Sequence, residues 1–222
     1  MLDWDTIDTV LFDLDGTLID LRLDACFWKE IVPQAYAEKN AVSPTQSRQK
    51  LKRLYHEVEH SMQWYDIDHW ADTLNLPIRD MQRAHAVNTQ VRSGVYSLLT
   101  TLKSMDKRLM ILTDSHPFSL QVKMENCDLA PHFDHLISSH EFQQPKMNST
   151  LWTALYRDYQ IDPNRTLLLD DIEAVLDQAK QNRLAYTIGI ENPDSRLPPK
   201  SFQRHHSIDD FHRLLEQADD NG

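Results

Sequence analysis

Two aspartates stand one residue apart directly after an apolar run near the start of the chain. Residues 9–12 (TVLF) are followed by residues 13–17 (DLDGT), which contain Asp13 and Asp15. A buried strand that ends in charged residues brings them to the carboxyl edge of an open α/β sheet, where such sheets bind ligands. There one carboxylate can attack an electrophile while the next carries a proton, with a hard cation holding them together. An Asp-Gly turn closing a hairpin is the alternative interpretation.

Three later segments carry polar groups that complement this pair, in chain order. Residues 113–115 (TDS) follow an expected strand and supply a hydroxyl and backbone N–H groups at a helix start, which suits a phosphate. A Pro-Lys pair at 145–146 offers one ammonium near another helix start. Residues 170–171 (DD) end a further strand and are oxygen ligands for a hard cation. Together these segments give the candidate site residues Asp13, Asp15, Thr113, Asp114, Ser115, Lys146, Asp170 and Asp171.

Each of these later segments has a simpler explanation when taken alone. A Thr-Asp-Ser segment is usually a turn and helix cap, and paired aspartates usually stabilise a helix N-terminus. A single lysine is nearly always a solvated surface residue. The functional interpretation rests on all four segments occurring together, in order, each at or near the end of a strand.

The elements that must position these residues are predicted by alternating hydrophobic patterns. From about residue 91 onward, short apolar runs alternate with helical patterns, which is typical of βαβ units and a parallel sheet. With the strand before Asp13, we expect about five strands. The expected strands after residue 91 are 108–113, 133–138, 166–169 and 185–190, and the expected helices are 117–126, one beginning at Ser149, 173–182 and one capped by Ser207.

Residues 21–89 have a different character, because they show helical periodicity and no strand pattern. Ser43 begins a capping box with proline at the first helical position, and apolar residues then recur at helical spacing as far as Met62. Residues 24–39 also appear helical, with Pro33 expected to kink or break that helix. We therefore expect a core formed by residues 1–20 and 90–222 and an inserted helical cap formed by residues 21–89.

Composition limits the partners of the chain. Its 222 residues carry a formal net charge of −11, which argues against binding a nucleic-acid polymer. No apolar run approaches the roughly 18 residues of a membrane span, and the acidic N-terminus does not resemble a signal peptide. Cys26 and Cys127 are far apart, and the 11 histidines are scattered, so no zinc or disulfide framework is indicated. We expect a soluble cytoplasmic protein with a small-molecule substrate; a monomer is plausible, but the sequence does not fix the oligomeric state.

The four segments resemble the motifs of the haloacid dehalogenase (HAD) superfamily, most of whose members are Mg²⁺-dependent phosphatases. The resemblance implies a Rossmannoid α/β core with a C1-type helical cap, and an aspartyl-phosphate intermediate formed on Asp13. Asp15 would be the general acid and base, and Thr113, Asp114, Ser115 and Lys146 would bind phosphate. Asp13, the Asp15 carbonyl and Asp171 would hold Mg²⁺, with Asp170 nearby. The chain departs from the usual pattern at Asp114 and Asp170, where other residues are more common.

Further segments resemble the 5'-nucleotidases of this superfamily that act on GMP and IMP. They are 27–28 with 32–33, 55–56 with His60 and 64–65, 112–113 with 116–117, and 192–195. The resemblance implies a purine nucleotide as substrate, with Trp28, Trp64 and Tyr65 stacking on the base and His56 and His116 near phosphate or ribose. The alternative is that these aromatics fill a small helical core and these histidines lie on the surface.

Two other functions stay open on the sequence alone. The same core supports a phosphatase or phosphomutase acting on a sugar phosphate or phosphoglycolate. A non-catalytic protein that binds a phosphorylated metabolite is the alternative outside enzymes, although it would not require Asp13, Asp15 and Lys146 together.

Overall fold

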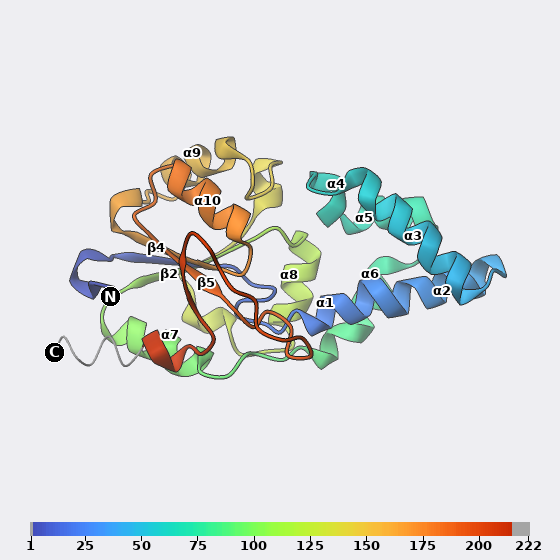
Figure 1. Ribbon diagram of the computed structural model, residues 1–222, viewed down its shortest axis with the longest axis horizontal. Helices are drawn as coiled ribbons and strands as arrows, with labels where there is room; N and C mark the ends of the chain where they lie inside the picture. Colours follow the sequence, from blue (N-terminus) through green and yellow to red (C-terminus); the bar gives the residue numbers. More distant parts are fainter. Residues whose placement is uncertain (1, 215–222) are drawn as a thin grey trace.

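The computed structural model describes residues 2–214 and contains a six-stranded, fully parallel sheet in the order β3-β2-β1-β4-β5-β6 (Figure 1). The strands are β1 (Thr9–Phe12), β2 (Arg108–Thr113), β3 (His135–Ser138), β4 (Thr166–Asp170), β5 (Tyr186–Ile190) and β6 (His206–Ile208). β1 lies between β2 and β4, so Phe12 is paired with both Ile111 and Leu169. The predicted α/β class is confirmed.

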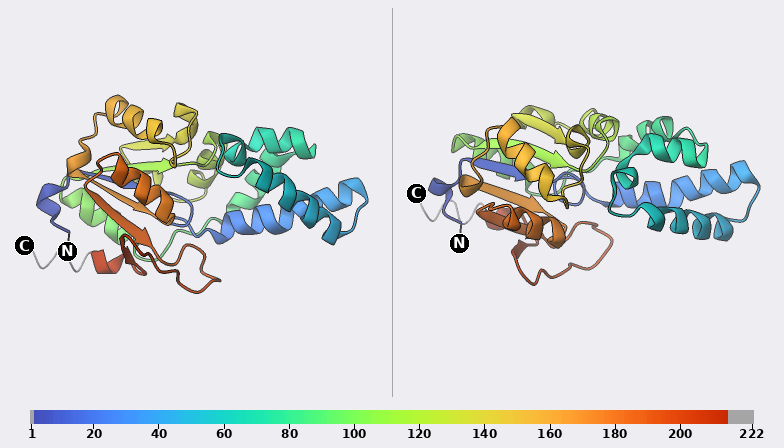
Figure 2. Two further views of the ribbon diagram at one scale, coloured as in Figure 1. Left: turned by 45° about the horizontal axis from the view of Figure 1, so that its top comes forward. Right: turned by 90° about the horizontal axis from the view of Figure 1, so that it is seen from above.

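Helices cover both faces of this sheet (Figures 1 and 2). They are α7 (Val95–Ser104), α8 (Pro117–Met124), α9 (Ser149–Asp158) and α10 (Glu173–Gln181). Residues of the central strands alternate between two cores: Val10 and Phe12 pack in the core that includes α7, whereas Leu11 packs in the core that includes α9 and α10. Because both faces are covered, the strands are continuous apolar runs that carry polar residues only at their ends.

The segment between β1 and α7 folds into helices that extend away from the sheet (Figure 2). They are α1 (Arg22–Cys26), a π-helix (Phe27–Ile31), α2 (Val32–Asn40), α3 (Pro44–Val58), α4 (Met62–Tyr65), α5 (Ile67–Leu74), α6 (Ile78–His85) and a 3₁₀ turn (Ala86–Asn88). This helical block has a hydrophobic core of its own, which includes Phe27, Leu51 and Trp70. The block therefore does not depend on the sheet to bury its apolar face.

Two chain segments connect the helical block to the sheet, and they lie side by side. Ile19 and Val91 form an antiparallel bridge, and the Asp20 N–H donates to the Gln90 carbonyl at 3.0 Å. The loop after β5 also contacts this junction, because the Leu21 N–H donates to the Pro193 carbonyl at 2.8 Å. The loop at 192–195 is thus tied to the start of α1.

One local expectation was wrong, and a second was wrong in part. Ser207 lies within β6, a sixth strand, rather than at the N-cap of a helix. Three residues with one buried side chain carry too little periodicity to be seen as a strand in the sequence. Pro33 does not break the helical path through residues 22–40: it occupies the first turn of α2, where a missing N–H is tolerated, and the preceding turn is a π-helix.

Within residues 2–214, no helix combines the length and apolar character needed to cross a bilayer.

We predict that Leu168→Ala destabilises the protein strongly. Leu168 is fully buried in β4, and removing its side chain leaves a cavity that costs about 2–5 kcal/mol of unfolding free energy. Leu197→Ala is the control, because Leu197 is 62% exposed and its loss should change stability by less than about 0.5 kcal/mol. Chemical denaturation measures both variants, and equal effects would contradict this account of the core.

Candidate active site

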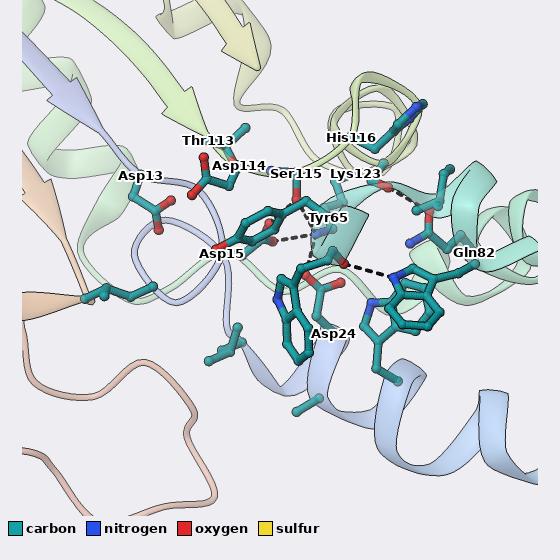
Figure 3. Close-up of a pocket in the computed structure, with 18 of the residues that line it drawn as sticks. Asp13, Asp15, Asp24, Tyr65, Gln82, Thr113, Asp114, Ser115, His116 and Lys123 are labelled. Atoms are coloured by element: carbon teal, nitrogen blue, oxygen red, sulfur yellow. Dashed lines mark hydrogen bonds and ion pairs between the residues drawn. The ribbon is translucent and has the colours of Figure 1, made fainter. Parts of the chain in front are cut away.

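The carboxyl ends of β1, β2 and β4 meet at one end of a cavity of about 330 Å³, and α8 and helices of the block line the rest of it (Figure 3). The sheet side of the lining includes Asp13, Asp15, Thr113, Asp114, Ser115, Lys146 and Asp171. This volume lies within the usual range of small-molecule sites. The structure thus brings the residues singled out after separate strands into one place.

Lys146 is buried, and its ammonium lies between two carboxylates. Its Nζ donates to Asp13 Oδ1 at 2.6 Å and to Asp170 Oδ2 at 2.7 Å. The backbone of Lys146 is also fixed, because its N–H donates to Asp114 Oδ1 and its carbonyl accepts from the indole N–H of Trp152. Lys146 is therefore a fixed positive charge inside the site and not a solvated surface lysine.

Burial dominates the electrostatics of the carboxylates around Lys146. It raises the pKa of Asp13 to about 7, even though the Lys146 ammonium acts in the opposite direction. Burial likewise raises the pKa of Asp170 and of Asp171 to about 6. For Lys146, burial opposes the charged form, but Asp13 and Asp170 outweigh it and hold the pKa well above its usual value. Three buried carboxyl groups therefore lie around a single buried ammonium.

The carboxylates of Asp13, Asp170 and Asp171 fit a hard divalent cation. Each can contribute one oxygen to a set whose members all lie within 4.8 Å of one another. Asp13 Oδ2 is buried without a hydrogen-bond partner among the described residues. Lys200 donates to Asp171 Oδ2 at 3.1 Å. Oxygen donors with surplus negative charge are the ligands preferred by Mg²⁺.

Gly16 allows the loop after β1 to approach Asp171 closely. Its φ is +94°, a conformation that side chains disfavour, and a Cβ atom there would lie 2.9 Å from Asp171 Cγ. The glycine in the Asp-x-Asp-Gly motif is therefore required by the packing of two site segments against each other.

The loop after β2 is held by its own polar groups. Thr113 Oγ1 accepts from the Ser115 N–H at 3.0 Å, and the Ser138 hydroxyl donates to the Ser115 carbonyl at 2.6 Å. Asp114 is buried, and its carboxylate accepts from the Lys146 backbone as described above. This contact gives Asp114 a role in joining the two loops.

Both carboxylate oxygens of Asp15 accept hydrogen bonds from side chains. The Ser115 hydroxyl donates to Oδ2 at 2.6 Å, and the Lys123 ammonium donates to Oδ1 at 2.6 Å. Sequence reasoning missed Lys123. Helical spacing could have indicated that Lys123 faces inward. It lies on the same face of helix 117–124 as Ser119 and Leu120, and both of these are buried.

Four of the five residues expected from the helical block and its surroundings line the cavity: Trp28, Trp64, Tyr65 and His116. His56 does not, because its side chain is 84% exposed and pairs with Glu59. His116 caps α8 and lies 3.7 Å from Asp68 of α5. His116 therefore sits where the core meets the helical block.

The aromatic residues of the cavity also pack against one another. Tyr55 contacts Trp70 edge-to-face with ring centroids 4.8 Å apart, and it contacts Trp28 and Trp64 in the same way. These rings therefore belong both to the hydrophobic core of the block and to the wall of the cavity. The polar and aromatic lining residues that were not proposed as site residues from the sequence are Asp24, Lys29, Tyr55, Trp70, Gln82, Ser119 and Lys123.

The sequence of this chain matches a known protein family and is similar to characterised proteins. The sequence model of the haloacid dehalogenase-like hydrolases matches residues 7–181. The chain is 39% identical over 212 residues to the GMP/IMP nucleotidase YrfG of Escherichia coli K12, covering 96% of both proteins. The same figures hold for the GMP/IMP nucleotidase of Shigella flexneri.

Among solved structures, a HAD phosphatase from Thermococcus onnurineus superposes with a TM-score of 0.80 at 17% identity, covering 96% of this chain and 98% of that one. An L-2-haloacid dehalogenase from Xanthobacter autotrophicus gives a TM-score of 0.66 at 16% identity, covering 96% of this chain and 98% of that one. Because both identities are low, these similarities show a shared fold.

We predict that Lys146→Met destabilises the protein by about 3–5 kcal/mol, because Asp13 and Asp170 then lose the only ammonium between them and stay buried. Lys103→Met is the control, since Lys103 forms an exposed pair with Asp134 and should cost at most about 1 kcal/mol. Urea denaturation in the presence of a chelator measures both. Similar small losses in the two variants would argue against a buried charge cluster.

Proposed function

The chain belongs to the haloacid dehalogenase-like hydrolases, and we propose that it is a Mg²⁺-dependent phosphomonoesterase acting on nucleoside 5'-monophosphates, with GMP and IMP preferred. The observation that carries the proposal is the convergence of Asp13, Asp15, Thr113 and Lys146 at the sheet end of a cavity lined by aromatic residues. We further propose that it works in the cytoplasm and that residues 21–89 are a cap domain over a core of residues 1–20 and 90–222.

In the first step, a carboxylate oxygen of Asp13 attacks phosphorus and forms a covalent aspartyl phosphate. The bond between phosphorus and the 5'-oxygen breaks, and the leaving oxygen takes the proton of the Asp15 carboxyl group. Lys146, the Thr113 hydroxyl and the N–H groups that follow it hold the phosphoryl oxygens as charge develops on them. The support for this assignment is that all these groups line one cavity.

In the second step, a water molecule attacks the phosphorus of the aspartyl phosphate. Asp15, now a carboxylate, takes the proton of that water, and the bond between phosphorus and the Asp13 oxygen breaks. Inorganic phosphate leaves, and Asp13 returns to its starting form. The two steps require Asp15 to hold one orientation toward the reacting atoms throughout the cycle.

Asp13, Asp170 and Asp171 would hold Mg²⁺, with the Asp15 carbonyl as a further proposed ligand. When bound, the cation offsets the repulsion between the anionic nucleophile and the anionic phosphate ester. The buried surplus of carboxylates over ammonium groups in this cluster supports that assignment.

The helical block supplies the substrate preference in this proposal. Trp28, Trp64 and Tyr65 of the helical block offer aromatic surface in the cavity, and a purine base presents a matching π-face. The relatives named GMP/IMP nucleotidase support the purine assignment, since they align over 96% of this chain, block included.

We predict Mg²⁺-dependent phosphate release from nucleoside monophosphates that is selective for GMP and IMP over sugar phosphates. Asp13→Asn should lower kcat by about a thousandfold or more, because the amide cannot form the covalent intermediate. Phosphate release across a substrate panel, with and without chelator, measures both effects. Full activity of Asp13→Asn would exclude the mechanism, whereas preference for a sugar phosphate would exclude only the substrate assignment.

We predict that Trp64→Ala raises KM for GMP by about 10-fold, because base stacking on an aromatic ring contributes about 1–3 kcal/mol. The KM for glycerol phosphate, which has no base, should change little. His56→Ala is the matched control in the same block, since His56 is exposed and outside the cavity. Steady-state kinetics on both substrates decides the point, and parallel changes in the two KM values would count against stacking.

A further inference from the structure

Lys123 is a second buried lysine in the cavity wall, and its ammonium joins two parts of the chain (Figure 3). It lies on α8 of the core. Its Nζ donates to Asp15 Oδ1 at 2.6 Å and to Asp24 Oδ2 at 2.7 Å. Asp15 belongs to the loop after β1, whereas Asp24 belongs to α1 of the helical block. One ammonium therefore connects the proposed acid–base residue to the block.

The contacts around Asp15 leave it one orientation. Lys123 holds Oδ1 and the Ser115 hydroxyl holds Oδ2, and Lys123 Nζ also lies 3.4 Å from the Ser115 hydroxyl. Lys123 also donates to Asp24, so hydrogen bonds connect Asp24 to Asp15 through Lys123. Loss of Asp24 would leave Lys123 with Asp15 and Ser115 as its only partners among the described residues, and loss of Lys123 would leave Asp15 Oδ1 without its donor.

Stability alone does not explain a lysine in this place. Taking an ammonium out of water is costly, and a buried salt bridge often contributes no more to stability than apolar residues of similar volume. Burial opposes the charged form of Lys123, but Asp15 and Asp24 outweigh it and keep the pKa of Lys123 above its usual value. An exposed ion pair, Arg83 with Glu125, already connects the block to the end of α8.

We propose that Lys123 is a positioning residue that directs Asp15 toward the reacting atoms, and that Asp24 makes this positioning depend on the seating of the helical block. The inference rests on the proposed phosphomonoesterase function. Lys123 acts on the two proton transfers through Asp15, and it neither receives a proton nor contacts phosphate.

If Lys123 acts through Asp15, its loss should slow reactions whose leaving group needs a proton and spare those whose leaving group does not. Nucleoside 5'-oxygen is a poor leaving group and depends on the Asp15 proton, whereas p-nitrophenolate departs without one. With enzyme in excess over substrate, release of nucleoside or of p-nitrophenol reports the first step alone. Lys123→Met should therefore slow the release of nucleoside selectively.

The experiment compares single-turnover rates of Lys123→Met, Asp24→Asn and the double variant with wild type on GMP and on p-nitrophenyl phosphate. We expect nucleoside release to fall by about 10- to 100-fold in Lys123→Met, part of the contribution typical of general acid catalysis. Release of p-nitrophenol should stay within about threefold of wild type, because its leaving group takes no proton. Asp24→Asn should show the same selectivity with a smaller loss.

One control variant and the double variant keep the result interpretable. Arg83→Met removes the exposed pair with Glu125 and should leave both rates unchanged. The double variant Lys123→Met/Asp24→Asn removes one ammonium and one carboxylate together, so it is the one to use if Lys123→Met alone does not fold. Its nucleoside release should fall like that of Lys123→Met.

Equal losses on both substrates in a folded variant would overturn the proposal, because they would place Lys123 on the phosphate. Unchanged nucleoside release would overturn it as well. If wild type releases no nucleoside from GMP but hydrolyses another alkyl phosphate, the nucleotide assignment fails and the same comparison runs on that ester. Failure of wild type on every ester would instead remove the proposed function.

Discussion

The buried ammonium of Lys146 between Asp13 and Asp170 is the interaction on which the rest of the site depends. Parallel strands deliver their polar ends to one edge, and here that edge forms one end of the cavity that the helical block also lines. Three carboxylates in such a space repel one another, and burial makes each charge more costly. Lys146 offsets part of this repulsion, and the remainder is the electrostatic reason that the same carboxylates fit a divalent cation. The close approach at Gly16 serves the same cluster, because it brings the Asp13–Asp15 loop against Asp171.

Lys146 and Lys123 each pair with a different set of carboxylates. Lys146 lies with Asp13 and Asp170, the groups proposed to react and to bind the cation, whereas Lys123 lies with Asp15 and Asp24. The first cluster is built entirely from the sheet and its loops. The second includes α1 and therefore brings the helical block into contact with the proposed acid–base residue. The charge beside the proposed nucleophile is thus separate from the contacts that hold the proposed proton donor.

Much of the core could be predicted from sequence, because buried parallel strands are apolar runs that end abruptly in polar residues. That pattern located β1, β2 and β4 and the groups that follow them. The sixth strand was missed since β6 has one buried side chain, and the predicted break at Pro33 did not occur because Pro33 lies in the first turn of α2, directly after a π-helix. Asp24 and Lys123 could not be paired from sequence: they lie 99 residues apart on separate helices, and only the docking of α1 against α8 brings them together. His56 shared its helix with residues of the block core, but it lies on the exposed side.

The most direct test of the account is chemical trapping of the proposed covalent intermediate. Enzyme mixed with GMP and Mg²⁺ is quenched in acid during turnover, reduced with borohydride, and digested for peptide mass spectrometry. An aspartyl phosphate is reduced at its acyl carbon, so the account predicts homoserine in place of Asp13 and unmodified aspartate at position 15. Phosphate release without any modification at Asp13, or modification at another carboxylate, would contradict it.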